Sequence, residues 1–355
     1  MRRLVFAAAV LLGCALLPAS GREAGAAISL EKCTLCHGKP EFRKLLVNGA
    51  IRDVFVTADS LKGSVHEKKV CTECHFDVSE IPHRESPKRV TCTHCHFKGN
   101  KEGAPQSDNV LAYFDSAHGK AIAAGNVKAP LCQDCHGDHQ ILKVKNPESK
   151  VSRFKVAETC GRCHMEIYAK YKTSIHGVAV GKGIAEAPSC TGCHGEHRIY
   201  AHTDPKSTVY PTRVSEQCSK CHASVAIMSK FGIEAEQVAT YNESFHGVAT
   251  KFGSRTVANC SSCHGVHDIR PPDDPRSTVN PKNIPTTCGK AACHPGATAN
   301  FAVGKIHVDA KKKESGIIYW TATFFKYLTI GTMLALIVHI FLDMYGRTRR
   351  LRGEQ

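Results

Sequence analysis

The stretch Cys190-Thr191-Gly192-Cys193-His194 is followed directly by Gly195-Glu196-His197. It has the pattern C-x-x-C-H, in which two thiols attach a c-type haem and the adjacent histidine becomes the proximal iron ligand. The pattern occurs eight times, and a ninth copy has four residues between its thiols, so chance is excluded. The copies are Cys33–His37, Cys71–His75, Cys92–His96, Cys132–His136, Cys160–His164, Cys190–His194, Cys218–His222, Cys260–His264 and the stretched Cys288–His294.

The cysteine count leaves little room for other chemistry. Of the 19 cysteines, 18 fall in these motifs and the other is Cys14. A disulfide scaffold would need thiols without adjacent histidines, and paired zinc knuckles would leave the histidine after each second cysteine unexplained. We therefore expect nine haem c groups, eight at regular motifs and one at the stretched motif. The predicted attachment residues are Cys33, Cys36, Cys71, Cys74, Cys92, Cys95, Cys132, Cys135, Cys160, Cys163, Cys190, Cys193, Cys218, Cys221, Cys260, Cys263, Cys288 and Cys293, and the predicted proximal ligands are His37, His75, His96, His136, His164, His194, His222, His264 and His294.

Chain length per haem predicts the fold class. Residues 28–316 provide about 32 residues for each haem, which is too little to enclose each one in its own apolar core. The haems themselves are expected to form the core, with short helices and extensive loops between them. The formal charge is +15, but about eighteen haem propionates would offset it. The basic composition therefore does not predict nucleic-acid binding.

The two ends of the chain predict export and anchoring. Residues 1–27 have a charged start, an apolar middle and small residues before a cleavage site, as a signal peptide does. Leu11-Leu12-Gly13-Cys14 also fits a lipoprotein signal. Residues 317–342 are long and apolar enough to cross a bilayer, and the arginine-rich tail, residues 343–355, suits the cytoplasmic side. His339 in the membrane segment is either a functional group or a histidine in a helix interface.

The region between these ends divides in two. Residues 28–110 carry three motifs at irregular spacing, and residues 111–316 contain a two-haem repeat that occurs three times. Each repeat opens with Ser-x-His-Gly, at His118, His176 and His246, fourteen residues before a first cysteine. Each first motif continues as C-H-G-x-H, and a second motif begins 28 residues after the first. Lys305-Ile306-His307 stands where a fourth repeat would open.

The remaining histidines can supply the second iron ligand. A histidine three residues after the proximal one emerges on the same side as it, so it cannot readily complete its own haem and is expected to reach a neighbouring iron. The opening histidines could complete a haem in the same or the adjacent repeat. His94, between the cysteines of its own motif, and His202, without a counterpart in the other repeats, are expected to be spare. The predicted distal ligands are His66, His83, His118, His139, His176, His197, His246, His267 and His307.

With these motifs and the C-terminal anchor, the chain resembles the multihaem c-type cytochromes of anaerobic and metal-respiring bacteria. In particular it is similar to the membrane-anchored cytochrome c subunits of quinol-linked respiratory complexes. The resemblance implies bis-histidine haems stacked as a closely spaced wire. Bis-histidine ligation lacks the potential-raising methionine, so low reduction potentials are expected.

The predicted function is electron transfer by a nonahaem cytochrome c in the bacterial cytoplasmic membrane, with its haem domain in the periplasm and its C-terminus in the cytoplasm. It would take electrons from a quinol-oxidising or b-type cytochrome subunit of the membrane and pass them to periplasmic redox proteins. The alternative is a multihaem reductase of nitrite, hydroxylamine or a sulfur oxyanion, which needs one open iron position. No C-x-x-C-K motif, which some such enzymes use, is present in the sequence. A haem-based sensor or structural anchor would leave nine haems unexplained.

Overall fold

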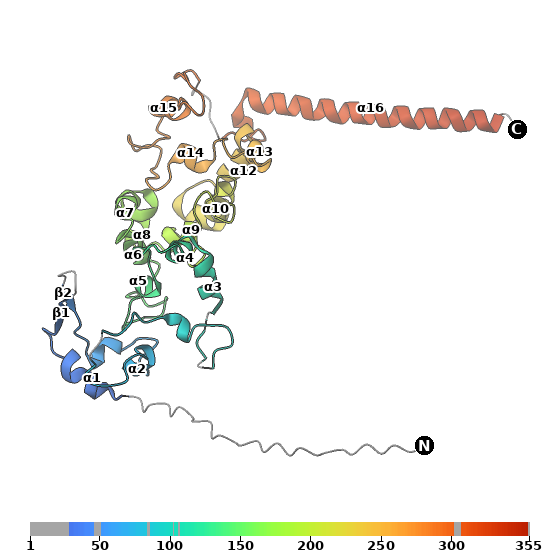
Figure 1. Ribbon diagram of the computed structural model, residues 1–355. Helices are drawn as coiled ribbons and strands as arrows, with labels where there is room; N and C mark the ends of the chain where they lie inside the picture. The colour runs from blue at the N-terminus through green and yellow to red at the C-terminus, as the bar shows by residue number, and fades with distance from the viewer. Residues whose placement is uncertain are drawn as a thin grey trace, which may run out of the picture. The chain divides into compact units, whose positions relative to one another are not determined.

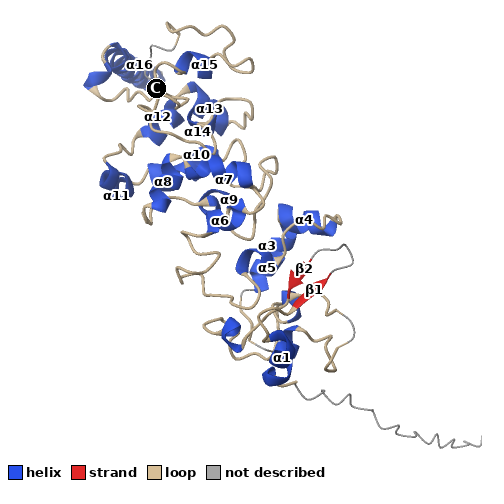
Figure 2. Ribbon diagram, turned by 90° about the vertical axis from the view of Figure 1, so that its left-hand side faces the viewer, coloured by secondary structure: helices blue, strands red, loops and turns tan. Residues whose placement is uncertain are grey.

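The computed structural model describes residues 28–45, 51–83, 86–101, 103–105, 107–301 and 307–353. The predicted signal peptide, residues 1–27, lies outside the described residues. The chain forms two compact units: the first comprises the described residues up to His94 together with His139–Ile141, and the second comprises Cys95–Asp138 and the described residues from Leu142 onward. The prediction of a mainly helical chain with extensive loops is confirmed, because the described residues contain short helices and only one small sheet (Figure 2).

Unit 1 is built from short elements around its C-x-x-C-H motifs. The strands β1 (Arg43–Leu45) and β2 (Ile51–Asp53) pair antiparallel, with Lys44 opposite Arg52. The Val65 N–H donates to the Ile141 carbonyl at 2.8 Å, which attaches the distant segment His139–Ile141 to this unit. The helical elements of the unit are α1 (Leu30–His37), η1 (Ala58–Leu61), α2 (Cys71–Cys74) and η2 (Cys92–His94).

Unit 2 contains the three repeats, which follow one another in sequence order (Figure 1). Each repeat has four helices: one before the opening serine, one after it, and one at or before each motif. The additional α11 (Val225–Met228) and η3 (Ser229–Phe231) lie between repeats two and three. The helices are α3 (Ser107–Asp115), α4 (Ala117–Ala123), α5 (Cys132–His136) and α6 (Val156–Gly161) in repeat one; α7 (Met165–Lys172), α8 (Ile175–Gly181), α9 (Cys190–His194) and α10 (Val214–His222) in repeat two; and α12 (Gln237–Glu243), α13 (Phe245–Lys251), α14 (Cys260–His264) and α15 (Ile284–Cys288) in repeat three.

The Ser-x-His-Gly sequence has a structural cause in every repeat. The serine is the N-cap of the second helix and accepts a hydrogen bond from the glycine N–H, at 3.1 Å for Ser174 and Gly177. A β-carbon added at Gly177 would lie 2.0 Å from the Tyr171 carbonyl oxygen, so only glycine allows the two helices to approach this closely. The same cap and the same close approach occur at Ser116 with Gly119 and at Ser244 with Gly247.

A tyrosine three residues before each opening serine connects the first helix to the first motif. The Tyr171 hydroxyl donates to the Pro188 carbonyl at 2.9 Å, two residues before Cys190. Equivalent bonds join Tyr113 to Pro130 at 2.6 Å and Tyr241 to Ala258 at 3.1 Å. This tyrosine therefore fixes the distance between the opening histidine and the first motif of its repeat.

The polypeptide itself buries little apolar surface. Among the described residues, eight hydrophobic side chains are buried, and three of them are alanines. The most deeply buried side chains include Ser116, Ser174 and Ser207, which serve in caps and turns. The described residues therefore bury few large apolar side chains against one another.

Helix α16 (Ile317–Gly353) has 37 residues and is exposed along its length. It is the one helix among the described residues that is long and apolar enough to cross a membrane, by length and composition. The predicted membrane segment, residues 317–342, lies inside it. The helix continues through most of the basic tail, where Arg347 and Asp343 form an ion pair of 2.9 Å across one turn.

Candidate functional site

Predicted proximal and distal histidines face each other in seven pairs. The ring centres within each pair lie 5.9–6.3 Å apart. Each pair contains one histidine from a C-x-x-C-H or C-x₄-C-H motif and one from the predicted distal set. The pairs are His37 with His83, His136 with His197, His164 with His118, His194 with His267, His222 with His176, His264 with His307, and His294 with His246.

This spacing leaves room for one metal ion between two imidazoles. Two metal–nitrogen bonds of about 2.0 Å, with about 1.1 Å from each nitrogen to its ring centre, place the ring centres about 6.2 Å apart. No group of three or more His, Cys, Asp or Glu side chains that could hold a metal gathers within the described parts of the chain. Each pair would therefore hold an iron through two imidazole nitrogens, and a haem would supply the remaining donors. The residues present fit haem c on this count.

The pairing follows one rule in the repeats. The opening histidine pairs with the second motif of its own repeat, as His176 does with His222. The histidine of the C-H-G-x-H sequence pairs with the first motif of the preceding repeat, as His197 does with His136 and His267 does with His194. These histidines therefore connect neighbouring repeats, in the manner expected from their position beside the proximal ligand.

A backbone hydrogen bond reinforces each of these connections. An isoleucine lies two residues after the C-H-G-x-H histidine. Its carbonyl accepts a hydrogen bond from the N–H of the residue that follows the opening serine of the preceding repeat. Ala117 donates to Ile199 and Ile175 donates to Ile269, both at 2.8 Å. The Val65–Ile141 bond in unit 1 has the same form, which identifies Ser64-Val65-His66 as a further opening segment. That segment lies only five residues before Cys71 and lacks the glycine, so the sequence repeat did not reveal it.

His307 has a different role from the one suggested by its position in the sequence. Its ring pairs with His264 of the first motif in repeat three, as a C-H-G-x-H histidine does, and not with a second motif as opening histidines do. The Thr240 hydroxyl lies 3.1 Å from His307 Nδ1 and also donates to the Gln237 carbonyl. His307 Nδ1–H therefore donates to the threonine oxygen, and its Nε2 remains available for a metal.

The stretched ninth motif keeps the backbone geometry of the regular motifs. In regular copies the histidine N–H bonds to the carbonyl of the first cysteine, at 2.9 Å in Cys160–His164. In the stretched copy the His294 N–H still bonds to the Cys288 carbonyl, at 3.0 Å. The two additional residues form a turn in which Cys293 N–H donates to Lys290. His294 thereby reaches the same kind of pair, with its ring centre 6.2 Å from that of His246.

The cysteines of successive motifs lie close together in the second unit. Hydrogen bonds join the thiols of Cys160 and Cys190, and those of Cys218 and Cys260, across the repeat boundaries. Within repeat one, burial and then the nearby Cys160 thiol raise the pKa of Cys135 to about 11. The neighbouring motifs in space are therefore the neighbouring motifs in sequence. In unit 1 the thiols of Cys33 and Cys71 are hydrogen-bonded in the same way.

Burial lowers the pKa of several of the paired histidines and so favours the neutral form that a metal ligand needs. Burial, with a smaller contribution from His222, lowers the pKa of His176 to about 4. Burial also lowers the pKa of His136, His194 and His264. Carbonyl oxygens orient other predicted proximal rings through Nδ1, at 2.8 Å from Val54 to His37 and at 3.0 Å from Pro105 to His96.

His75 is buried, its Nδ1 has no hydrogen-bond partner, and burial followed by the charge of His139 lowers its pKa. His66 belongs to the opening segment of unit 1. Of the histidines predicted to be spare, His94 stacks on Phe76 with ring centres 4.7 Å apart, and His202 is exposed in a turn. His339 is exposed on α16.

Sequence reasoning missed the residues that position the pairs. The three tyrosines at 113, 171 and 241, the isoleucine carbonyls and Thr240 all act through hydrogen bonds that the motif pattern does not contain. The regular position of the tyrosines, three residues before each opening serine, was the available signal. No protein-family model, curated protein or solved structure matches this chain.

Proposed function

We propose that this protein is a membrane-anchored nonahaem cytochrome c that transfers electrons and does not itself convert a substrate. The observation that carries the proposal is the set of seven histidine pairs whose separation suits one iron each. Each pair stands beside a cysteine pair of a haem-attachment motif. Haem c, when bound, supplies one-electron chemistry at iron.

The chain's own residues would then set the order of the carriers. Because thiols of successive motifs are in contact, such as Cys160 with Cys190, the haem edges attached to them would also be adjacent. The route through unit 2 would follow the sequence from Cys132 to Cys293. At these seven centres, two imidazoles would hold one iron between them and would leave no position for a substrate, which supports electron transfer over catalysis.

The membrane end of this route would lie in repeat three. His307 is ten residues before Ile317, where α16 begins. Electrons would enter from a quinol-oxidising or b-type cytochrome subunit of the membrane and leave toward periplasmic redox proteins. The exported location rests on the sequence of residues 1–27 and on the arginine-rich end of α16.

The test is an EPR spectrum of the fully oxidised, purified protein, with haem and iron content assayed on the same sample. We expect nine haems, all six-coordinate and low-spin. A stoichiometric high-spin signal would identify one open iron, and the reductase would then become the better assignment. Fewer than eight covalently bound haems would contradict the proposed cofactor set.

A further inference from the structure

In the first two repeats, one face of the helix after the opening serine contacts the next repeat. In α4, the Ala117 N–H donates to the Ile199 carbonyl. The Lys120 ammonium lies 3.8 Å from the Asp204 carboxylate and 5.5 Å from the Tyr200 ring centre. In α8, Ile175 makes the equivalent backbone bond to repeat three. This face is therefore the one on which the following repeat is placed.

The equivalent face of α13 is apolar and exposed. It consists of Phe245, Val248 and Phe252, whose side chains are 82%, 42% and 88% exposed. In repeat two the position of Phe252 is occupied by Lys182, an exposed and charged residue. After repeat three there is no fourth repeat, and the chain continues instead into the juxtamembrane segment (residues 307–316) and α16.

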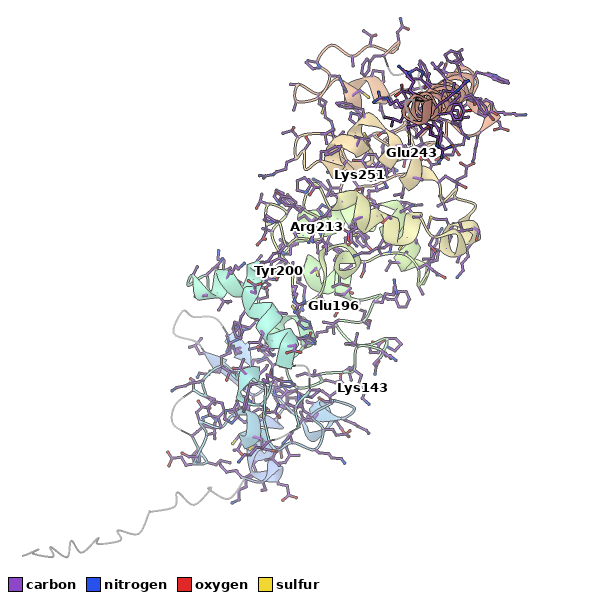
Figure 3. All side chains as sticks on the ribbon, turned by 90° about the vertical axis from the view of Figure 1, so that its right-hand side faces the viewer. Lys143, Glu196, Tyr200, Arg213, Glu243 and Lys251 are labelled. Atoms are coloured by element: carbon purple, nitrogen blue, oxygen red, sulfur yellow. The ribbon has the colours of Figure 1, made fainter. Side chains whose placement is uncertain are left out.

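Short connections hold α13 next to the start of α16. The Lys311 ammonium lies 3.0 Å from the carboxylate of Glu243, which is the last residue of α12 and two residues before Phe245. From Lys311 the chain reaches Ile317 through a compact turn, in which Ser315 N–H donates to Lys312 and Gly316 N–H to Lys313. Figure 1 shows α12 and α13 beside the N-terminal end of α16. Figure 3 shows Glu243 and Lys251 close to α16, which is seen there along its axis.

We propose that the Phe245–Val248–Phe252 face of α13 inserts into the outer-leaflet interface of the bilayer that α16 crosses. Phenylalanine and valine beside lysines form the combination that binds a lipid surface, with apolar side chains in the acyl boundary and ammonium groups at the headgroup phosphates. Lys251 on α13 and Lys312 and Lys313 in the juxtamembrane segment supply these charges. The inference rests on α16 acting as a membrane anchor, as in the proposed function.

Insertion would fix the last ligand pair at the membrane surface. His246 directly follows Phe245, and its ring lies 6.2 Å from that of His294. The helix that enters the lipid would thus carry the distal ligand of the ninth centre. Electrons arriving from within the membrane would meet this centre and that of His264 first.

Photo-crosslinking in the haem-loaded full chain tests the proposal. Phe252 is replaced by p-benzoylphenylalanine and the protein is placed in nanodiscs of phosphatidylcholine and phosphatidylglycerol. The matched control carries the same probe at Lys182, one repeat earlier at the equivalent helix end, and a second control carries it at Leu336 within α16. After irradiation, we expect lipid adducts at residue 252, by mass spectrometry, at least about fivefold above those at residue 182.

The other outcomes separate the two proposals. Lipid adducts at residue 336 but not at residue 252 would overturn the insertion of α13 and leave the anchor intact. Adducts at neither residue would overturn the anchor itself. A crosslink from residue 252 to another protein in native membranes, without lipid adducts, would make the α13 face a protein-docking surface. If the residue 252 variant does not load haem, the probe at Val248 gives the same readout.

Discussion

Internal and terminal junctions of the repeats provide the same ligand by different means. Between repeats two and three, a loop supplies both His267 for the ring pair and Ile269 for a backbone bond to α8. At the end of repeat three, the juxtamembrane segment supplies His307, which Thr240 orients. The imidazole planes meet at 18° in the first case and 35° in the second. The formation of a histidine pair and the docking of a repeat are thus separable properties in this chain.

Removing the ligand at each junction should give the largest effect. We expect His267→Ala and His307→Ala each to convert one of the nine haems to high spin, because the opposite histidine then has no partner across the iron. The two variants should differ in structure, since only the second loses the attachment of the juxtamembrane segment. EPR spin quantitation measures the first effect. Trypsin cleavage after Lys311, Lys312 and Lys313 measures the second and should accelerate only in His307→Ala.

Equal cleavage rates in the two variants would mean that the juxtamembrane segment is held independently of His307. An all-low-spin spectrum in either variant would show that the pair in question is not an axial ligand set. Exogenous imidazole is the control for both, because it should restore the low-spin signal without restoring resistance to trypsin.

Disrupting the close helix contact at an opening segment should give the next largest effect, a loss of thermal stability. In Gly177→Ala the new methyl group would meet the Tyr171 carbonyl oxygen, so the two helices must separate at a cost of about 3 kcal/mol. Gly181→Ala in the same helix is the control, because no atom lies within 4 Å of the added carbon. Thermal unfolding of the haem-loaded protein measures both. A similar melting temperature for the two variants would refute the steric account of Ser-x-His-Gly.

The terminal junction alone has a threonine that orients its ligand. Thr240→Val removes the hydroxyl that accepts from His307 Nδ1–H and leaves only the Gln237 backbone as a partner of this ring, so we expect a loss of about 1 kcal/mol of stability. The imidazole also becomes a weaker donor, which should raise the reduction potential of one haem and shift one low-spin EPR signal. Thr240→Ser keeps the hydroxyl and should behave as the wild type. A spectroelectrochemical titration distinguishes these results from a change in packing, which would affect both variants.

The sequence predicted the histidines of the candidate sites better than it predicted the architecture that positions them. The C-x-x-C-H motifs and the positions of the remaining histidines predicted the rings that form the seven pairs, and haem attachment at these pairs stays a prediction. The sequence also predicted that histidines such as His197 reach a neighbouring centre. Spacing did not reveal the opening segment at Ser64, which depends on the Val65–Ile141 backbone hydrogen bond. It also did not reveal that His307 pairs with His264 of a first motif, because this pairing depends on contacts between segments far apart in sequence. The apolar pattern was equally uninformative, because so few side chains are buried by protein alone.

The smallest effect should come from the exposed polar contact at the first junction. The Tyr200 hydroxyl donates to Asp115 at 2.7 Å, and this bond, followed by that from Lys206, lowers the pKa of the Asp115 carboxyl to about 2. A carboxyl whose pKa is lowered on folding stabilises the fold above its unfolded pKa and loses that contribution as the pH falls toward the folded value. Asp115→Asn should therefore lower the denaturation midpoint slightly near pH 6 and much less at about pH 2, where about half of the wild-type carboxyls are protonated. Tyr200→Phe should remove much of the same pH dependence, and the double variant should add little, because both substitutions break one contact. A constant difference across this pH range would instead mean that Asp115 acts through packing and not through its charge.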